Sequence, residues 1–433
     1  MTWALPSQAL AFAGFLAERL ELGRVAVVGH DRTPTAPLKG ITVSFVDPSQ
    51  VDGIGQGCLP LFVAPRNPDR SVSETGSALL KVEGRHQLAL VVSPPLDDPS
   101  VKDVDSVARW LALYGLNAPL VGDLPRVGDA PMGTIALIED PDRPLSPVAT
   151  PPKDFSVVAF VPIYNEIDIL EQSIDDLNQQ GVQAYVLDNW STDGSYELAA
   201  SRVGRGVVGI ERTPIDGPPP FYDYRAILSR IEKLATKITA DWYVKHDVDE
   251  VRRSPWVGSS LREAIYRADV AGYNRIDFTV ANFPPTDNGF EAGSDFVGHF
   301  RHFVWGHNPG HFVQQKAWKD LNRDVSIAAN AGHLVEFEGA RTHPYKFLLR
   351  HYPIRSQEHG ERKVFRDRKP RISTEELKKG WHTHYDRYEP GHSFLADPDE
   401  IEPYDIDFHE RYLIERLSGV GIERLAPIRR PES

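Results

Sequence analysis

The sequence lacks the features that mark secreted, membrane-spanning or nucleic-acid-binding proteins. Its 433 residues include one cysteine, Cys58, so no intrachain disulfide can form. No run reaches the ~18 apolar residues that span a bilayer, and the N-terminus lacks the basic segment and long apolar core of a signal peptide. The net charge of −13 repels phosphate backbones. We therefore expect a cytoplasmic protein with no transmembrane segment and no nucleic-acid partner.

The composition and one proline-rich stretch predict how the chain divides. Hydrophobic residues make up 41% of the chain and charged residues 25%, as in ordinary globular proteins. At roughly 100–200 residues per domain, two or three domains are expected. Residues 141–152 read PDRPLSPVATPP, which is typical of a stiff linker. We expect a small α/β domain at 1–140, a linker at 141–153, a main domain at 154–372, and an extension at 373–433 that packs on it.

The first 140 residues alternate between helix-like and strand-like segments. Their strand-length apolar runs are Val25–Val28, Ile41–Val46, Leu61–Ala64, Leu88–Val92 and Thr134–Ile138. The first run ends in a glycine and resembles a degenerate Rossmann-like nucleotide-binding unit, but the G-x-G-x-x-G pattern is missing. The favoured interpretation is an α/β domain used for packing or partner contacts.

The main domain begins with strands and helices in alternation. The runs SVVAFVPIY, AYVLD and WYVK have strand character, and helical spacing separates them at Ile167–Leu177 and Tyr224–Ile238. Alternation of this kind predicts a mostly parallel, right-handed, Rossmann-like sheet flanked by helices. Ligands of such sheets bind at the carboxyl ends of the strands, and the polar clusters of this sequence fall there.

Carboxylates follow the WYVK strand in the segment His246-Asp247-Val248-Asp249-Glu250. Asp247 and Asp249 flank one residue, so in an extended turn both can face one ligand. Close carboxylates repel one another unless a cation neutralises them, and hard oxygen ligands suit Mg²⁺ or Mn²⁺. A solvated acidic turn is the alternative, because D-x-D is a common tripeptide.

Two more polar segments follow earlier strands. Val161-Pro162-Ile163-Tyr164-Asn165-Glu166 joins the first strand to a helix, and Asn165 is a good helix cap. The segment 188–195, DNWSTDGS, makes a polar turn after the second strand, with Asp188 at the strand end. Each alone reads as a turn and a cap. PIYNE, DNWSTDGS and DVDE occur in this order along the chain. Together the three motifs resemble those of glycosyltransferase family 2, whose enzymes have the GT-A fold. The resemblance covers residues 155–280 well and extends loosely to about 370.

The resemblance implies a nucleoside-diphosphate-sugar donor, with UDP- or GDP-sugars favoured, and a glycan or other hydroxyl acceptor. It implies that three residues line the nucleoside pocket: Pro162, Tyr164 and Glu166. Asp188 would contact the base, and Asp247 would lie near the ribose or donor sugar. Asp249, with Asp247 as a further candidate ligand, would hold a Mn²⁺ or Mg²⁺ ion on the diphosphate, where a cation stabilises the leaving group.

A later histidine often completes the metal site in this family. His333 and His351 are the candidates, and His351 is preferred because it follows an apolar stretch. Basic residues suited to a diphosphate come soon after it: Arg355, Lys363, Arg366 and Arg368. Arg355 and Lys363 are the candidate donor-binding residues, with a solvated basic helix face as the alternative.

An inverting transfer also needs a general base near the acceptor hydroxyl. Downstream carboxylates qualify without a clear choice among them: Asp287, Glu291, Asp295, Asp324, Glu336 and Glu338. We take Asp249, Glu250 and Glu338 as the candidate catalytic carboxylates. A histidine cluster lies among aromatic residues at His299, His302, His307 and His311. Acceptor-sugar stacking or plain packing is a better interpretation of this segment than a zinc site.

Two other functions compete with the glycosyltransferase. A nucleotidyltransferase uses a similar sheet and metal, but it usually opens with a Gly-rich loop where this chain has PIYNE. A non-catalytic, glycosyltransferase-like binding or assembly protein would not need an intact DVDE. The sequence is compatible with a homo-oligomer but does not determine the oligomeric state, the base, the sugar or the acceptor.

Overall fold

The computed structural model describes residues 149–256, 258–305, 314–343, 345–372 and 385–405. Before residue 149 it describes residues 24–29, 42–55, 57–63, 88–93, 120–123 and 133–139. Single positions complete the set: 9, 10, 13, 14, 17, 22, 78, 79, 81, 82, 107, 111 and 408. The chain divides into two compact units. The first contains Met1–Val148, His343–Lys346 and Ile406–Ser433, and the second Ala149–Thr342 and Phe347–Asp405.

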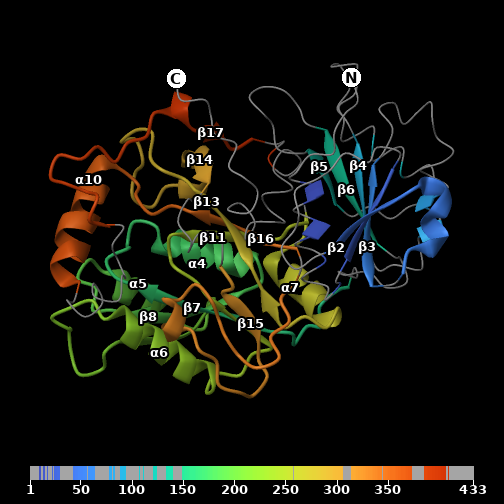
Figure 1. Ribbon diagram of the computed structural model, residues 1–433. Coiled ribbons are helices and arrows are strands. Elements are labelled where there is room, and N and C mark those ends of the chain that lie inside the picture. The colour runs from blue at the N-terminus through green and yellow to red at the C-terminus, as the bar shows by residue number, and fades with distance from the viewer. Residues whose placement is uncertain are drawn as a thin grey trace. The chain divides into compact units, whose positions relative to one another are not determined.

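The first unit is built on a six-stranded sheet in the order β2-β1-β3-β4-β6-β5 (Figure 1). Its strands are β1 (Arg24–Val28), β2 (Thr42–Val46), β3 (Cys58–Val63), β4 (Leu88–Ser93), β5 (Leu120–Asp123) and β6 (Thr134–Glu139). The first four pair in parallel, and β6 runs antiparallel to both neighbours. A short 3₁₀ helix, η1 (Pro48–Gly53), starts where the Asp47 carboxylate accepts the Ser49 N–H. The described residues of all five apolar runs lie in strands of this sheet.

The second unit contains a mixed sheet in the order β12-β15-β10-β7-β8-β9. Its parallel part comprises β7 (Val157–Ile163), β8 (Gln183–Asp188), β9 (Val207–Arg212) and β10 (Trp242–Lys245). On the far side of β10, β15 (Ala317–Lys319) and β12 (Arg275–Ile276) pair antiparallel. The βαβ alternation of the sequence therefore forms the expected parallel core, and residues much later in the chain extend it.

Helices α4 (Leu170–Gln179), α5 (Ser195–Ser201), α6 (Tyr224–Ala235) and α7 (Leu261–Val270) accompany this sheet. Side-chain caps mark the start of α6 and of α7. The Asp223 carboxylate accepts the Ala226 N–H at the start of α6, and Ser260 and Glu263 form a capping box at α7. Apolar side chains at helical spacing bury one face, as at Ile227, Leu228 and Ile231 of α6.

A second sheet of five strands lies in the same unit, in the order β11-β16-β13-β14-β17. The strands are β11 (Glu250–Arg253), β13 (Phe278–Asn282), β14 (His302–Trp305), β16 (Phe347–His351) and β17 (Glu402–Pro403). The short helices are α8 (Phe296–His299), η2 (Ala328–Asn330), α10 (Gln357–Glu361), the π-helix η3 (Arg362–Arg368), η4 (Lys369–Arg371) and η6 (Pro398–Glu400). Phe300 and Phe303 are buried here, which favours packing over sugar stacking for these rings.

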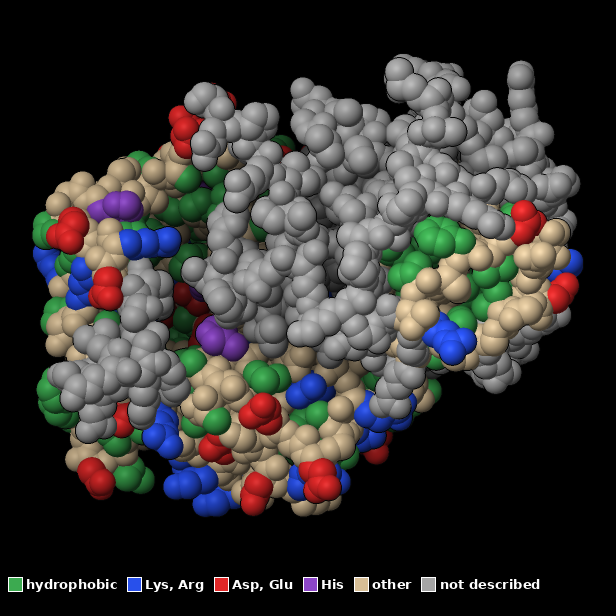
Figure 2. Space-filling view, in the orientation of Figure 1, with side chains coloured by type: hydrophobic (Ala, Val, Ile, Leu, Met, Phe, Trp, Pro, Cys, Tyr) green, Lys and Arg blue, Asp and Glu red, His purple; other side chains and the backbone are tan. Residues whose placement is uncertain are grey.

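Two further observations concern the helices and the surface of the described residues. None of their helices is long and apolar enough to cross a membrane. Acidic and basic side chains are intermixed over the described part of the face in Figure 2. The acidic side chains are therefore not gathered into one patch on that surface.

Candidate active site

The three polar motifs lie at one edge of the parallel strands. Ile163 of β7 pairs with Asp188 of β8, and Phe160 of β7 pairs with Lys245 of β10. The His246 N–H then donates to the Phe160 carbonyl at 3.0 Å, which keeps the start of the DVDE segment beside β7. Parallel strands end together, so PIYNE, DNWSTDGS and DVDE meet at the carboxyl edge where such sheets bind ligands.

Hydrogen bonds join the first two motifs to each other. The Asn165 N–H donates to the Ser191 hydroxyl at 3.0 Å, and the Thr192 N–H donates to the Asn165 side-chain oxygen at 2.8 Å. The Glu166 N–H donates to the Ser195 hydroxyl at 3.1 Å. Asn165 has a φ of 56°, a left-handed conformation that asparagine tolerates well. The two loops therefore form one rigid rim.

Asp188 is fully buried under this rim. Its carboxylate accepts the Ser191 N–H at 3.2 Å, and the Arg212 Nε lies 3.7 Å away. Burial raises the pKa of Asp188, and the Ser191 hydrogen bonds and Arg212 limit the rise. The Arg212 guanidinium lies 4.8 Å from the Trp190 ring centre and 4.2 Å from that of Tyr196. Arg212 ends β9, and the sequence reasoning missed it because no motif surrounds it.

Asp247 and Glu250 are held by buried cations. Lys245 contacts the Oδ2 of Asp247, and Lys316 Nζ lies 3.5 Å from the same oxygen. Lys316 also donates to Glu250 Oε1 at 2.8 Å, and Arg252 donates to Glu250 Oε2 at 2.6 Å. Burial alone would raise the pKa of Glu250, but Arg252 and Lys316 lower it well below its usual value. Glu250, the first residue of β11, is thus a fixed anion, whereas Asp247 remains 33% exposed.

The two oxygens of Asp249 face different partners. Oδ2 accepts from Lys363 Nζ at 2.9 Å, and Oδ1 lies 3.8 Å from His351 Nε2. The antiparallel pairing of Glu250 with His351 brings the end of β16 to this turn. His351 Nδ1 lies 2.8 Å from the Asn282 side-chain oxygen. Burial lowers the pKa of His351, although Asp249 opposes the effect, so the imidazole is neutral at pH 7 and keeps a lone pair.

Glu166 and Arg355 form a buried ionic group beside Asp249. Arg355 donates to Glu166 and, from Nε at 2.7 Å, to Asp168. Lys363 Nζ is 3.4 Å from Glu166 Oε1 and so joins this group to Asp249. Burial alone would raise the pKa of Glu166, but Lys363 and Arg355 lower it from 4.5 to about 2. Glu166 and Arg355 are both expected donor-binding residues, and the structure pairs them with each other.

The remaining expected residues lie in the rim, beside Gln314 and on an exposed turn. Pro162 and Tyr164 are half-buried in the rim, where the Arg371 guanidinium lies 4.0 Å from the Tyr164 ring centre. His333 binds Gln314 at 3.0 Å, and burial lowers its pKa to about 3. Glu338 is exposed on a turn whose carbonyl accepts from Arg323. Among the described residues, Glu338 lies outside the hydrogen bonds that join the three motifs.

Asp249 and His351 supply two atoms that can bind a divalent cation. A neutral imidazole nitrogen and a carboxylate oxygen face each other, and both are ligands that Mn²⁺ accepts. The described residues contain no group of three protein ligands for a metal, so most of the coordination would come from water and substrate. Of the four clustered histidines, His299 and His302 are described; His307 and His311 lie outside the described residues.

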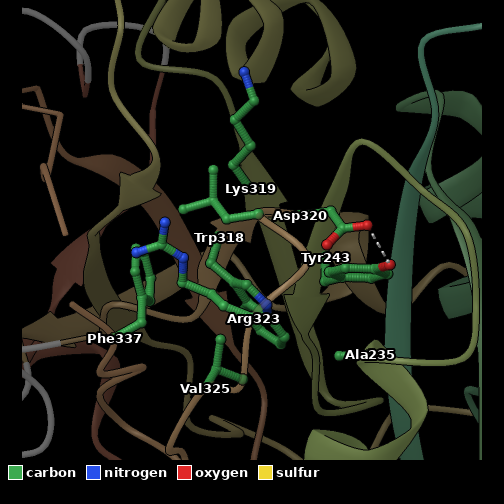
Figure 3. A pocket seen from close by; sticks show the side chains of 9 residues that line it. Ala235, Tyr243, Trp318, Lys319, Asp320, Arg323, Val325 and Phe337 are labelled. Atoms are coloured by element: carbon green, nitrogen blue, oxygen red, sulfur yellow. Dashed lines mark hydrogen bonds between the residues drawn. The ribbon is translucent and has the colours of Figure 1, made fainter. Parts of the chain in front are cut away.

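A pocket elsewhere in the second unit is lined by aromatic and charged side chains (Figure 3). Tyr243 of β10 and Trp318 of β15 form part of its wall, and the Tyr243 hydroxyl lies 3.3 Å from Asp320 Oδ2. None of the residues that line it belongs to the three strand-end motifs. It is therefore separate from the candidate active site.

Comparison with known proteins gives a distant structural likeness. No family model matches the chain, and no curated protein matches it. A crystal structure of S. aureus TarS aligns over 38% of this chain and 28% of TarS, at 10% identity and a TM-score of 0.25. TarS 1–349 in complex with UDP aligns over 46% of this chain and 61% of that fragment, at 10% identity and a TM-score of 0.28. Such scores do not decide function, which has to be argued from the site.

Proposed function

We propose that this chain is a metal-dependent glycosyltransferase of the GT-A type. It moves a sugar from a nucleoside-diphosphate-sugar, such as a UDP- or GDP-sugar, to a hydroxyl of a glycan or other acceptor. The observation that carries the proposal is the pair Asp249 and His351, which face each other at 3.8 Å beside the PIYNE and DNWSTDGS rim. The resemblance of these motifs to glycosyltransferase family 2 supports the same conclusion.

The nucleoside would bind over the rim. Tyr164 and Trp190 supply ring surface there. Arg212, which is 33% exposed and is held beside the buried Asp188, supplies a donor for the edge of a base. Asp247 is the exposed carboxylate of the turn, and the two lysines hold its Oδ2. Its Oδ1 is therefore oriented to accept a hydrogen bond from a hydroxyl of the ribose or donor sugar.

The diphosphate would lie against Asp249, His351 and Lys363. A bound Mn²⁺ or Mg²⁺ ion would stabilise the negative charge that develops on the leaving nucleoside diphosphate. Lys363 is the cation nearest to Asp249, so it can move from the carboxylate to a phosphate oxygen. Arg355 binds two carboxylates and serves to hold Glu166, which in turn orients Lys363.

Asp287 is the downstream carboxylate that we propose as the general base of an inverting transfer. It lies in the segment that follows β13. The last residue of β13 is Asn282, which contacts His351. The Gly289 N–H donates to Asp287 Oδ1 at 2.6 Å, and His299 Nε2 lies 3.3 Å from it. One oxygen is thus fixed, and the side chain is 60% exposed, so the other can accept a proton from an acceptor hydroxyl.

A thermal-shift screen of UDP-, GDP-, CDP- and dTDP-sugars, with and without Mn²⁺, tests the proposal. A cognate donor at about 100 times its Kd stabilises the fold by ~2.7 kcal/mol. Asp249→Asn should remove the Mn²⁺-dependent part of the shift and the sugar transfer, whereas Asp399→Asn, at an exposed aspartate outside the site, should change neither. Binding of no nucleotide by the wild-type protein would refute the proposal and favour a non-catalytic function.

A further inference from the structure

Asn282 and His351 end two adjacent strands of the second sheet. β13 and β16 run in parallel, and their register pairs Asn282 with His351. The Phe283 N–H donates to the His351 carbonyl at 2.7 Å, which keeps the two strand ends together beyond the last pair. The side chains meet as well, with Asn282 Oδ1 at 2.8 Å from His351 Nδ1. The backbone therefore fixes the distance at which these two side chains interact.

The contact determines which ring nitrogen of His351 carries the proton. An amide oxygen only accepts hydrogen bonds, so Nδ1 must donate to Asn282 Oδ1. A neutral imidazole has one N–H, so Nε2 then carries the lone pair. Nε2 is the nitrogen that lies 3.8 Å from Asp249 Oδ1. The lone pair therefore points toward the carboxylate, as a ligand of a shared cation requires.

We propose that Asn282 is a positioning residue that holds His351 in the Nδ1–H tautomer and so completes a two-residue cation site with Asp249. This inference rests on the proposed function, because it assigns a role within the same metal site. Partners that orient a histidine ligand typically contribute 10–100-fold to metal affinity. Asn282 should contribute within this range through its contact with His351.

The first test measures the affinity of the full-length protein for Mn²⁺ alone, from the electron paramagnetic resonance signal of free Mn²⁺. Asn282→Leu keeps the approximate volume but removes the acceptor, and it should weaken binding about 10–100-fold. Asn282→Asp keeps an acceptor oxygen and should restore binding. Asn330→Leu, which removes an amide bound to Glu336 outside the site, is the matched control and should leave Mn²⁺ affinity unchanged.

The outcomes separate this inference from the proposed function. Loss of Mn²⁺ binding in Asp249→Asn with unchanged affinity in Asn282→Leu would overturn the role of Asn282 and leave the metal site intact. Unchanged binding in Asp249→Asn would overturn the metal assignment itself. Equal weakening in Asn282→Leu and Asn282→Asp would indicate a packing role and would also overturn the inference.

A second test reads the tautomer in the wild-type protein, and one variant serves only to assign the signal. Nitrogen-15 chemical shifts distinguish the two imidazole tautomers, and a His351→Gln sample assigns the signal. We expect the metal-free protein to show a protonated Nδ1 and an unprotonated Nε2 on His351. A protonated Nε2 would refute the positioning role whatever the Mn²⁺ affinities are.

Discussion

Replacing Glu166 by glutamine should make the fold less stable and less sensitive to acid. The Glu166 carboxylate is buried between Arg355 and Lys363, and these cations lower its pKa from 4.5 to about 2. Lowering the pKa from 4.5 to about 2 corresponds to about 3 kcal/mol of stability. Because the folded-state pKa is the lower one, this stability is present above about pH 4.5 and is lost as the pH falls toward 2.

Urea unfolding between about pH 7 and about pH 3 measures this effect in the wild-type protein, in Glu166→Gln and in Glu400→Gln, a change at an exposed glutamate. At neutral pH, Glu166→Gln should unfold with about 3 kcal/mol less free energy than the wild type, and the difference should shrink in acid. Glu400→Gln should follow the wild type throughout. A loss below about 1 kcal/mol, or a variant that keeps the full acid dependence of the wild type, would refute the reasoning.

Four further changes test other parts of the structure. Glu250→Gln leaves Arg252 and Lys316 without their shared anion and should cost about 3–5 kcal/mol in urea unfolding; adding Lys316→Met should recover part of that loss. Asp287→Asn should lower kcat about 100-fold or more, while the thermal shift given by the donor stays the same. Arg212→Ala should weaken nucleotide binding about 10-fold in a calorimetric titration, through loss of a charged donor beside Asp188. Ser260→Ala removes the capping box of α7 and should lower stability by about 1 kcal/mol without affecting nucleotide binding.

Several contacts of the site join residues that lie far apart in the sequence. Lys363 lies 114 positions after Asp249, and Arg355 lies 189 after Glu166. Several basic residues come soon after His351, and their spacing does not indicate which of them faces a carboxylate. No sequence motif indicated that Arg252 and Lys316 are buried beside Glu250. An isolated basic residue in or beside a short strand is usually interpreted as an exposed charge.

The sequence by itself determined the parallel strands, the order of the three motifs and the grouping of Asp188, Asp247 and Asp249 at one sheet edge. These follow from local periodicity, since strands that alternate with helices pair in parallel and end together. Only the tertiary structure decided that His351 faces Asp249, that Asn282 binds His351, and that Glu250 is a fixed anion. The physical reason is that these contacts depend on the register of the second sheet, which no local pattern in the sequence encodes.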